Sequence, residues 1–386
     1  MITFKWPPQN STRIAEATKY LKYEKIGKKG YPEIVEKFER KFKKIIGTKY
    51  ALTFNSGTSA LLASFFSAKI KKNDKVIVPS LTFHATASPL INFKPKIIFC
   101  GCDEVGNISI HELTKKITKN IKLVIITHIG GHPCEMDEIL FLKKRYNFLL
   151  IEDCSHAHLS SYKGKKVGTF GDMAIFSMDR NKLLSTGEGG VLVTNNKNFY
   201  ERALIYSDFG PRLETINNYH LKRYKETGLG HKLRIHPISA AIAYSELGNL
   251  KKYIKLRKIR LKFLTDEINK ISGLMAPITK SYVDRGAFYS YRVFFKNKYI
   301  NKNYLDYFIK TCKKLGIDVR KSGNRPLHLL SLFNIKKKEK VVSAENFYNN
   351  TVSLPTFTFE SKKIIKQYIV KFKKAYSILN KTKKHH

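Results

Sequence analysis

The sequence is poor in acidic residues, in cysteine and in long apolar runs. Only 30 of its 386 residues are Asp or Glu, against 72 Lys and Arg, so the formal net charge is +42. The five cysteines, an odd number at low density, exclude a disulfide-rich secreted scaffold and are typical of buried thiols. No run of about 18 apolar residues is present, and the first residues, MITFKWPPQN, lack the apolar core of a signal peptide. We therefore expect a soluble, cytoplasmic protein with no membrane partner.

The large positive charge raises the possibility of a nucleic-acid or anionic-membrane partner. The basic residues are spread along the whole chain, and they accompany abundant Ile, Asn and Tyr, a composition that we attribute to an AT-rich genome. A basic regulator without catalytic activity would instead gather basic and aromatic residues on one face. We expect no specific nucleic-acid partner, and we keep the non-catalytic regulator as an alternative.

Neither of two candidate metal motifs has suitable spacing. Cys100 and Cys102 are too close for a structural zinc pair, and no second pair follows them. His128 and His132 are four residues apart, but the glycines and the proline around them break any helix that would align the two rings. We expect no metal, and we place both histidines in a loop at the rim of a site, with His128 the one that faces it.

Length and apolar pattern predict two α/β domains. A chain of 386 residues exceeds the size at which a single core keeps growing. Short apolar runs alternate with helical periods, which indicates βαβ units and a mainly parallel sheet. Strands are expected at 50–54, 76–78, 96–100, 123–127, 148–151, 173–177, 190–194 and 290–295, and helices at 32–46, directly after 55–59, and at 197–207, 237–272, 302–315 and 361–379. We place a large domain at 1–250 and a small C-terminal domain at 251–386.

An acidic residue and a lysine form the main candidate site. Asp153 follows the apolar run 148–151, so its carboxylate belongs at the carboxyl end of a buried strand, where open α/β sheets bind ligands. Lys182 lies between the run 173–177 and the turn Gly-Glu-Gly-Gly at 187–190. In a chain so rich in lysine, spacing alone leaves a solvated surface lysine as the alternative.

A third candidate feature is the turn Asn-Ser-Gly-Thr-Ser at 55–59, which enters a helix. A turn of small residues at a helix start offers free backbone N–H groups to an anion. An ordinary capped helix is the alternative.

Several motifs together resemble the DegT/DnrJ family of pyridoxal-phosphate (PLP) dependent sugar aminotransferases. They are IEDCSHAH, YKGKKVGTFGD, and a serine five residues before a lysine that is followed by GEGG. The similarity extends from Trp6 to about Leu250, and more loosely through Arg325 to His328 and Ser353 to Pro355. It implies the aspartate-aminotransferase fold (fold type I), with a large PLP-binding domain and a smaller α/β domain.

The resemblance also assigns roles to single residues. It implies that Lys182 carries PLP covalently, that Asp153 pairs with the pyridine nitrogen, and that His156 lies near the phenolic oxygen. The other cofactor-binding residues are Thr58, Ser59 and Ser177 at the phosphate and Phe83 on the ring. The candidate substrate residues are His128, Arg234 and His328.

The same resemblance implies a homodimer with shared active sites. In much of the family an asparagine two residues before Arg234 reaches the phosphate site of the neighbouring subunit. Lys232 occupies that position here, and a lysine can bind phosphate as a point charge.

The implied activity is transfer of an amino group from glutamate or glutamine to a keto-sugar, linked to a nucleotide, in amino-sugar biosynthesis. A lysine amine can form the bond to the cofactor and move protons, and an acid beside the ring nitrogen keeps that nitrogen protonated. The alternative within the family is a PLP-dependent sugar dehydratase or deoxygenase, in which the position of Lys182 typically holds histidine.

Overall fold

The structure is a computed structural model that describes residues 1–3, 11–22, 32–296, 302–321, 323–333 and 340–383. Trp6, where the sequence resemblance begins, lies outside the described residues.

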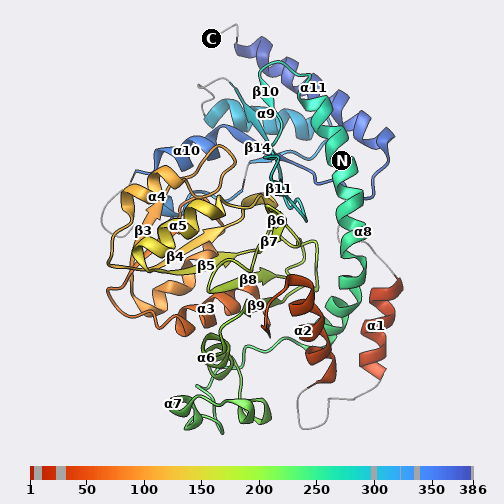
Figure 1. The fold of residues 1–386 in the computed structure, drawn as a ribbon. Coiled ribbons are helices and arrows are strands. Elements are labelled where there is room, and N and C mark those ends of the chain that lie inside the picture. Colours follow the sequence, from red (N-terminus) through yellow and green to blue (C-terminus); the bar gives the residue numbers. More distant parts are fainter. Residues whose placement is uncertain (4–10, 23–31, 297–301, 322, 334–339, 384–386) are drawn as a thin grey trace.

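A seven-stranded sheet forms the centre of the described chain (Figure 1). Its strand order is β1-β9-β8-β5-β4-β2-β3, and β8, β5, β4, β2 and β3 run parallel. β9 pairs antiparallel with both β1 and β8, so the sheet is mainly parallel, as predicted. The strands are β1 Tyr50–Phe54, β2 Lys75–Pro79, β3 Lys96–Cys100, β4 Ile121–Thr127, β5 Leu149–Asp153, β8 Met173–Ser177 and β9 Gly190–Thr194.

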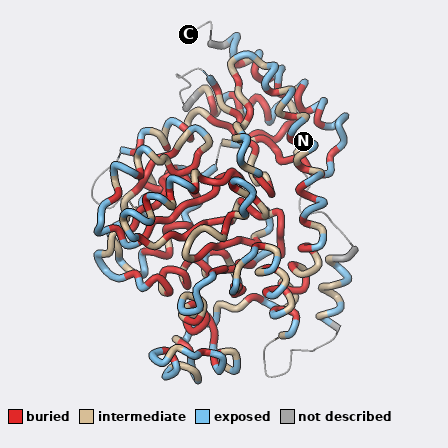
Figure 2. Tube along the Cα trace, in the orientation of Figure 1, coloured by how far each residue is buried: buried red, intermediate tan, exposed pale blue. Residues whose placement is uncertain are grey.

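Helices cover both faces of this sheet. Successive side chains of a strand point to opposite faces, so Ile125 and Ile151 pack in one core while Val124 and Leu150 pack in another. The first face is covered by α3 (Gly57–Ser67) and α6 (Lys197–Ser207). The second face is covered by α2 (Glu33–Ile46), α4 (Ile110–Lys116), α5 (Met136–Tyr146) and the first half of α8 (Pro237–Ile268). Figure 2 shows the strands buried between these layers, which leaves the strand ends as the accessible part of the sheet.

A four-stranded antiparallel sheet, called the second sheet below, has its own hydrophobic core. Its order is β10 (Leu274–Met275), β12 (Tyr291–Phe295), β14 (Thr351–Leu354) and β13 (Arg320–Lys321). It shares a core with α9 (Lys302–Lys314), α11 (Lys362–Lys383) and the second half of α8. Residue 250, the predicted domain boundary, lies inside α8, and the division into 1–250 and 251–386 remains our proposal.

The predicted helices and strands are confirmed within a few residues at their ends. Sequence analysis assigned no range to the remaining elements. Most of these are too short to show a period, but α1 and α5 have 12 and 11 residues. The elements are α1 Ser11–Lys22, α4, α5, α7 Tyr219–Lys222, α10 Val342–Asn349, β6 Ser161–Tyr162, β7 Lys165–Lys166, β10, β11 Val283–Asp284, β13 and β14, of which β11, β6 and β7 form a small third sheet.

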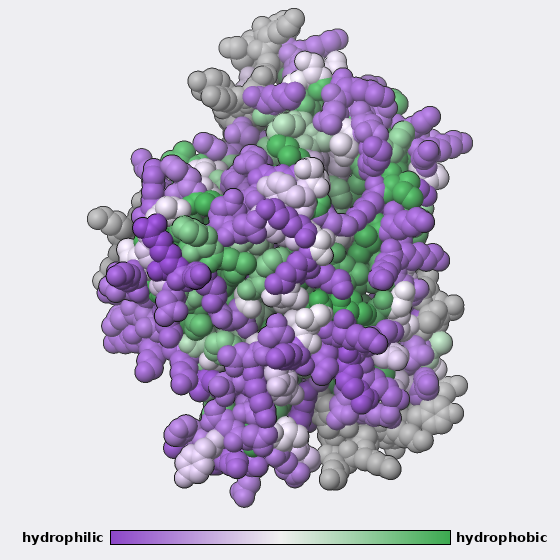
Figure 3. Space-filling view, viewed as in Figure 1, coloured by the Kyte–Doolittle hydropathy of each residue, from purple (hydrophilic) through white to green (hydrophobic). Residues whose placement is uncertain are grey.

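Hydrophilic residues cover most of the face drawn in Figure 3, in keeping with a chain in which 72 residues are Lys or Arg. Each helix of the described residues is too short or too polar to cross a membrane.

Candidate active site

A cavity of about 710 Å³ opens where the carboxyl ends of β4, β5 and β8 meet the second sheet. The large sheet contributes Thr127, Asp153 and Ser177, and the second sheet contributes Arg292 and Ser353. Parallel strand ends are where open α/β sheets bind ligands, and the cavity is large enough for a cofactor and a substrate.

Asp153 is the last residue of β5 and lies on the cavity wall with 4 % of its surface exposed. The Thr86 hydroxyl donates to its Oδ2 at 2.7 Å, and the Ser155 N–H donates to its Oδ1 at 3.0 Å. The Thr86 hydroxyl also contacts Thr82, whose own hydroxyl reaches Thr127. Each of the two carboxylate oxygens thus accepts one hydrogen bond, and the pair of bonds holds the group in one orientation.

Lys182 reaches the same cavity from the loop between β8 and β9. Two backbone bonds of Met178, with Gly189 and with Thr186, close this loop at its base. The Lys182 Nζ lies 4.2 Å from the centre of the Tyr289 ring. The structure therefore brings Asp153 and Lys182 to one cavity and excludes the interpretation of Lys182 as a solvated surface residue.

The His156 ring stacks on the same Tyr289 ring that Lys182 contacts. The ring centres are 4.0 Å apart and the planes are 14° apart. Burial lowers the pKa of the His156 imidazole well below its usual value, and the charges of Lys182 and Arg292 lower it further. The ring is therefore neutral at neutral pH. Its Nδ1 accepts the Gly130 N–H at 3.4 Å, so its own N–H is on Nε2.

The start of α3 forms a narrow edge of the cavity beside β8. The Ser56 hydroxyl caps the helix by accepting the Ser59 N–H at 3.1 Å. A Cβ on Gly57 would lie 3.1 Å from the Ser177 Cβ, so glycine allows the helix start to approach β8 closely. Thr58 and Ser177 line the cavity with Gly57, whereas the Ser59 hydroxyl is bonded to Ser56 at 2.9 Å. Helix N–H groups, hydroxyls and the helix dipole favour an anion at this point.

Comparison with known proteins extends these observations. Residues 8–371 match the model of the DegT/DnrJ/EryC1/StrS aminotransferase family. The chain belongs to this family. A UDP-4-amino-4,6-dideoxy-N-acetyl-beta-L-altrosamine transaminase of Campylobacter jejuni is 30% identical, over 100% of this chain and 99% of its own length.

Two further proteins agree with the assignment to the DegT/DnrJ/EryC1/StrS family. A GDP-perosamine synthase of Escherichia coli O157:H7 is 35% identical over 61% of this chain and 64% of its own length. The crystal structure of an aminotransferase from Psychrobacter cryohalolentis superposes with a TM-score of 0.89 at 23% identity, over 98% of this chain and 100% of that one. The fold is that of the PLP-dependent aminotransferases of fold type I, and the chain is an enzyme of this kind.

The cavity residues fit the PLP of this aminotransferase family. Lys182 offers an amine, Asp153 a fixed carboxylate for a protonated ring nitrogen, and the start of α3 with Ser177 an anion site for a phosphate. Phe83 lines the cavity with 45 % of its surface exposed, as an aromatic residue that covers a ligand ring would.

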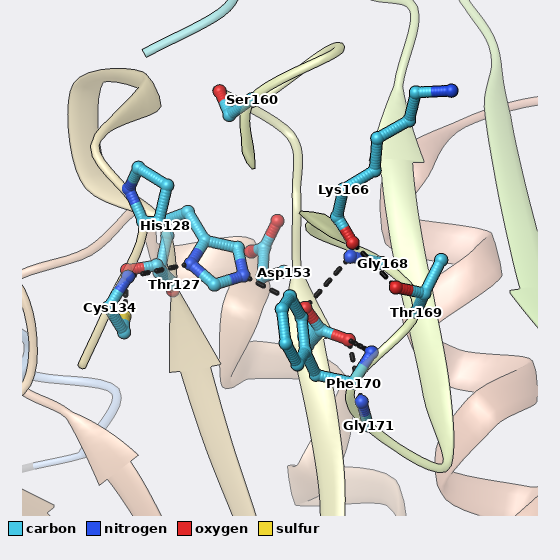
Figure 4. Close-up of polar contacts among 12 residues, drawn as sticks. Thr127, His128, Cys134, Asp153, Ser160, Lys166, Gly168, Thr169, Phe170 and Gly171 are labelled. Carbon is cyan, nitrogen blue, oxygen red and sulfur yellow. Dashed lines mark hydrogen bonds and ion pairs between the residues drawn. The ribbon is translucent and has the colours of Figure 1, made fainter. Parts of the chain in front are cut away.

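His128 requires a correction, because it is not one of the residues that line the cavity. Figure 4 shows its ring held between two hydrogen bonds, one of them with Cys134. Its side chain is fully buried, Nδ1 accepts the Cys134 N–H at 3.0 Å, and Nε2 donates to Glu152 Oε2 at 3.1 Å. Glu152 also accepts three backbone N–H groups, from Gly168, Phe170 and Gly171. The cause is strand alternation, which points Glu152 and His128 to the sheet face opposite to Asp153.

His128, Glu152 and Cys154 also form a group whose ligand atoms lie within 4.8 Å of one another among the described residues. A metal would need a lone pair of the imidazole. Both nitrogens of His128 are engaged, one as acceptor and one as donor, so we interpret this group as part of the core.

The other two candidate substrate residues also lie outside the cavity lining of the described chain. His328 is buried between the Ser80 hydroxyl (2.6 Å) and Glu345 of α10 (3.0 Å). Arg234 pairs with Asp208 at 3.3 Å and lies over the Phe209 ring. His328 is corrected here to a packing residue within one chain. A substrate role of Arg234 depends on a second subunit, as for Lys232, and stays a prediction.

Lys232 is exposed, and its Nζ lies 5.7 Å from the centre of the Phe209 ring. It does not line the cavity of its own chain, so a role at the phosphate depends on a second subunit and stays a prediction.

Sequence analysis missed Tyr289 and Arg292, which line the cavity from the second sheet and the turn before it. The sequence held one indication of Arg292, because this charged residue interrupts the otherwise apolar run of β12.

Proposed function

We propose that this enzyme transfers an amino group from glutamate or glutamine to a nucleotide-linked keto-sugar in amino-sugar biosynthesis. The observation that carries the proposal is the presence of Asp153 and Lys182 on the walls of one cavity. Two similar proteins, the Campylobacter transaminase and the Escherichia coli GDP-perosamine synthase, are named for sugar nucleotides, which supports a sugar nucleotide as the substrate class.

In this proposal PLP, when bound, supplies an electron sink for the carbon that gains or loses nitrogen. The Lys182 amine carries the proton to and from that carbon, and Asp153 keeps the ring nitrogen protonated. Neutral His156 would offer its Nε2 hydrogen to the phenolic oxygen of the bound cofactor. Thr58 and Ser177, which line the cavity, would hold the phosphate, and Phe83 would cover the ring. Ser59 would join them only by giving up its bonds to Ser56.

The test of reaction type is a single-turnover experiment on the PLP-loaded enzyme. Glutamate or glutamine alone should convert the bound cofactor to its amine form, seen as loss of its long-wavelength absorbance. A keto-sugar nucleotide should then restore the absorbance, and the mass of the sugar product should show one added nitrogen. A product that has lost a hydroxyl and gained no nitrogen would establish the dehydratase instead.

We further propose a homodimer in which Lys232 of each chain completes the phosphate site of the other. Lys182→Ala and Lys232→Glu should each be inactive alone, because each lacks one half of every site. After subunit exchange at equal amounts, half of the dimers are mixed and hold one intact site. Recovery of about one quarter of the wild-type activity is then expected.

Sedimentation should show that the chains are dimers, and differently labelled chains should show that the two variants have exchanged subunits in the mixture. Mixing two samples of Lys182→Ala is the matched control and should recover nothing. Proven exchange without recovery would contradict the shared site.

A further inference from the structure

The second sheet presents a row of three polar side chains to the cavity. Ser353 of β14 is the direct partner of Arg292 on β12 and of Arg320 on β13. Directly paired residues of antiparallel strands point to the same face, and all three residues line the cavity. The neighbours Tyr291 and Val293 point the other way, into the core shared with α8 and α11.

The two arginines of this row differ in their partners. Arg320 is exposed, and it donates two hydrogen bonds to Asp318, at 3.0 and 2.9 Å. Arg292 has 8 % of its surface exposed, and its Nε and Nη1 have no hydrogen-bond partner among the described residues. Its guanidinium lies 5.6 Å from the Phe347 ring, which cannot accept a conventional hydrogen bond.

A buried guanidinium without an acceptor is costly, because burial removes the water that would solvate its charge and its N–H groups. Burial lowers the pKa of Arg292 to about 10, so the group stays charged at neutral pH. Such a group is stabilised when an anion binds beside it, and the planar fork of arginine matches a carboxylate.

We propose that Arg292 binds the carboxylate of the amino donor, with the Ser353 hydroxyl beside it on the same face of the sheet. The inference rests on the proposed function, since it needs a donor in the cavity that also holds Lys182 and Asp153. Glutamate and glutamine both carry an α-carboxylate, so one arginine can serve either donor.

The other anion that the cavity would receive is the diphosphate of the sugar nucleotide. It carries two negative charges and is attached to a bulky nucleoside, whereas Arg292 is the one buried arginine of the described residues that lines the cavity. The exposed Arg320 and the partly exposed Lys321 lie farther along the same wall. The depth and the single charge of Arg292 favour the smaller carboxylate.

The experiment compares wild type, Arg292→Met and Arg292→Lys as PLP-loaded enzymes in calorimetric titrations. Glutarate probes a carboxylate site, and uridine diphosphate probes a diphosphate site. Loss of a charge-assisted hydrogen-bond pair should weaken glutarate binding about 10- to 100-fold in Arg292→Met. Arg292→Lys should recover part of this loss, because it keeps the charge without the fork. Uridine diphosphate should bind all three enzymes within about twofold.

Arg285→Met is the matched control. Arg285 is also a buried arginine, with 7 % of its surface exposed, but it lies outside the cavity lining and donates to the Gly130 carbonyl at 3.2 Å. The charges of Arg285 and Arg292 act on each other, so Arg285→Met should change the affinity for glutarate slightly, and far less than Arg292→Met does. Thermal unfolding should show that each variant is folded.

Three results would contradict the role of Arg292. These are equal glutarate affinity in wild type and Arg292→Met, weakening of uridine diphosphate alone, or the same loss of glutarate binding in Arg285→Met. The single-turnover reaction adds a second readout, since the glutamate concentration at half-maximal rate should rise as glutarate binding falls. If instead the wild type fails to convert its cofactor with any donor, the proposed function is wrong, and this is a separate outcome.

Discussion

Replacement of Lys182 by alanine is expected to lower the turnover of amino transfer about ten-thousand-fold or more. The variant loses both the amine that attaches to the cofactor and the group that moves the proton at the substrate carbon. Lys182 lies in a loop closed by backbone bonds of Met178, so the substitution should leave the fold and the cavity intact.

Turnover and a chemical label together check this assignment. Borohydride reduction of the PLP-loaded wild type should fix the cofactor to one peptide, the one that contains Lys182. Lys165→Ala is a suitable control, because Lys165 is exposed on β7 and lies outside the cavity lining. A label on another lysine, or near-normal turnover of Lys182→Ala, would show that a different residue carries the cofactor.

Asp153→Asn is expected to cut turnover about 100- to 1,000-fold while PLP still binds. An amide is uncharged, so it no longer favours the protonated form of the ring nitrogen, and the cofactor becomes a weaker electron sink. Binding should persist, because the start of α3 and Ser177 still offer the phosphate its site. Turnover and the absorbance of bound PLP are the measurements.

Glu152→Gln provides the matched control on the same strand. Glu152 points to the opposite face, where it accepts hydrogen bonds from His128 and from three backbone N–H groups. Its loss of charge should lower the free energy of unfolding by about 1–3 kcal/mol and change turnover little. Equal turnover losses in Asp153→Asn and Glu152→Gln would mean that Asp153 acts through stability alone.

The sequence predicted most of the fold because its strands are short apolar runs between clear helical periods. It could not show that β9 runs antiparallel, since an apolar run of five residues has no direction. Elements of two residues, such as β6 and β13, are defined by their partners and leave no pattern.

The site was predictable where a residue follows a strand of the large sheet or belongs to a family motif, as for Asp153 and Lys182. His128 was misplaced because a loop of glycine and histidine does not show which sheet face its side chains reach. Arg292 was missed for another reason. Its position beside the cavity depends on pairing with Ser353, 61 positions farther along the chain, and a single sequence does not show that pairing.

The helix α8 also limits how the cavity can open. Its 32 residues make a rod about 48 Å long, whose first half packs with α2 and whose second half packs under the second sheet. Between them, buried Arg257 donates to Thr358 at 2.8 Å and to the Ala287 carbonyl at 2.9 Å. A swing of one sheet away from the other would bend this rod and break these bonds. We therefore expect substrates to enter and leave through movement of the loop around Tyr289, with the two sheets held at a fixed spacing.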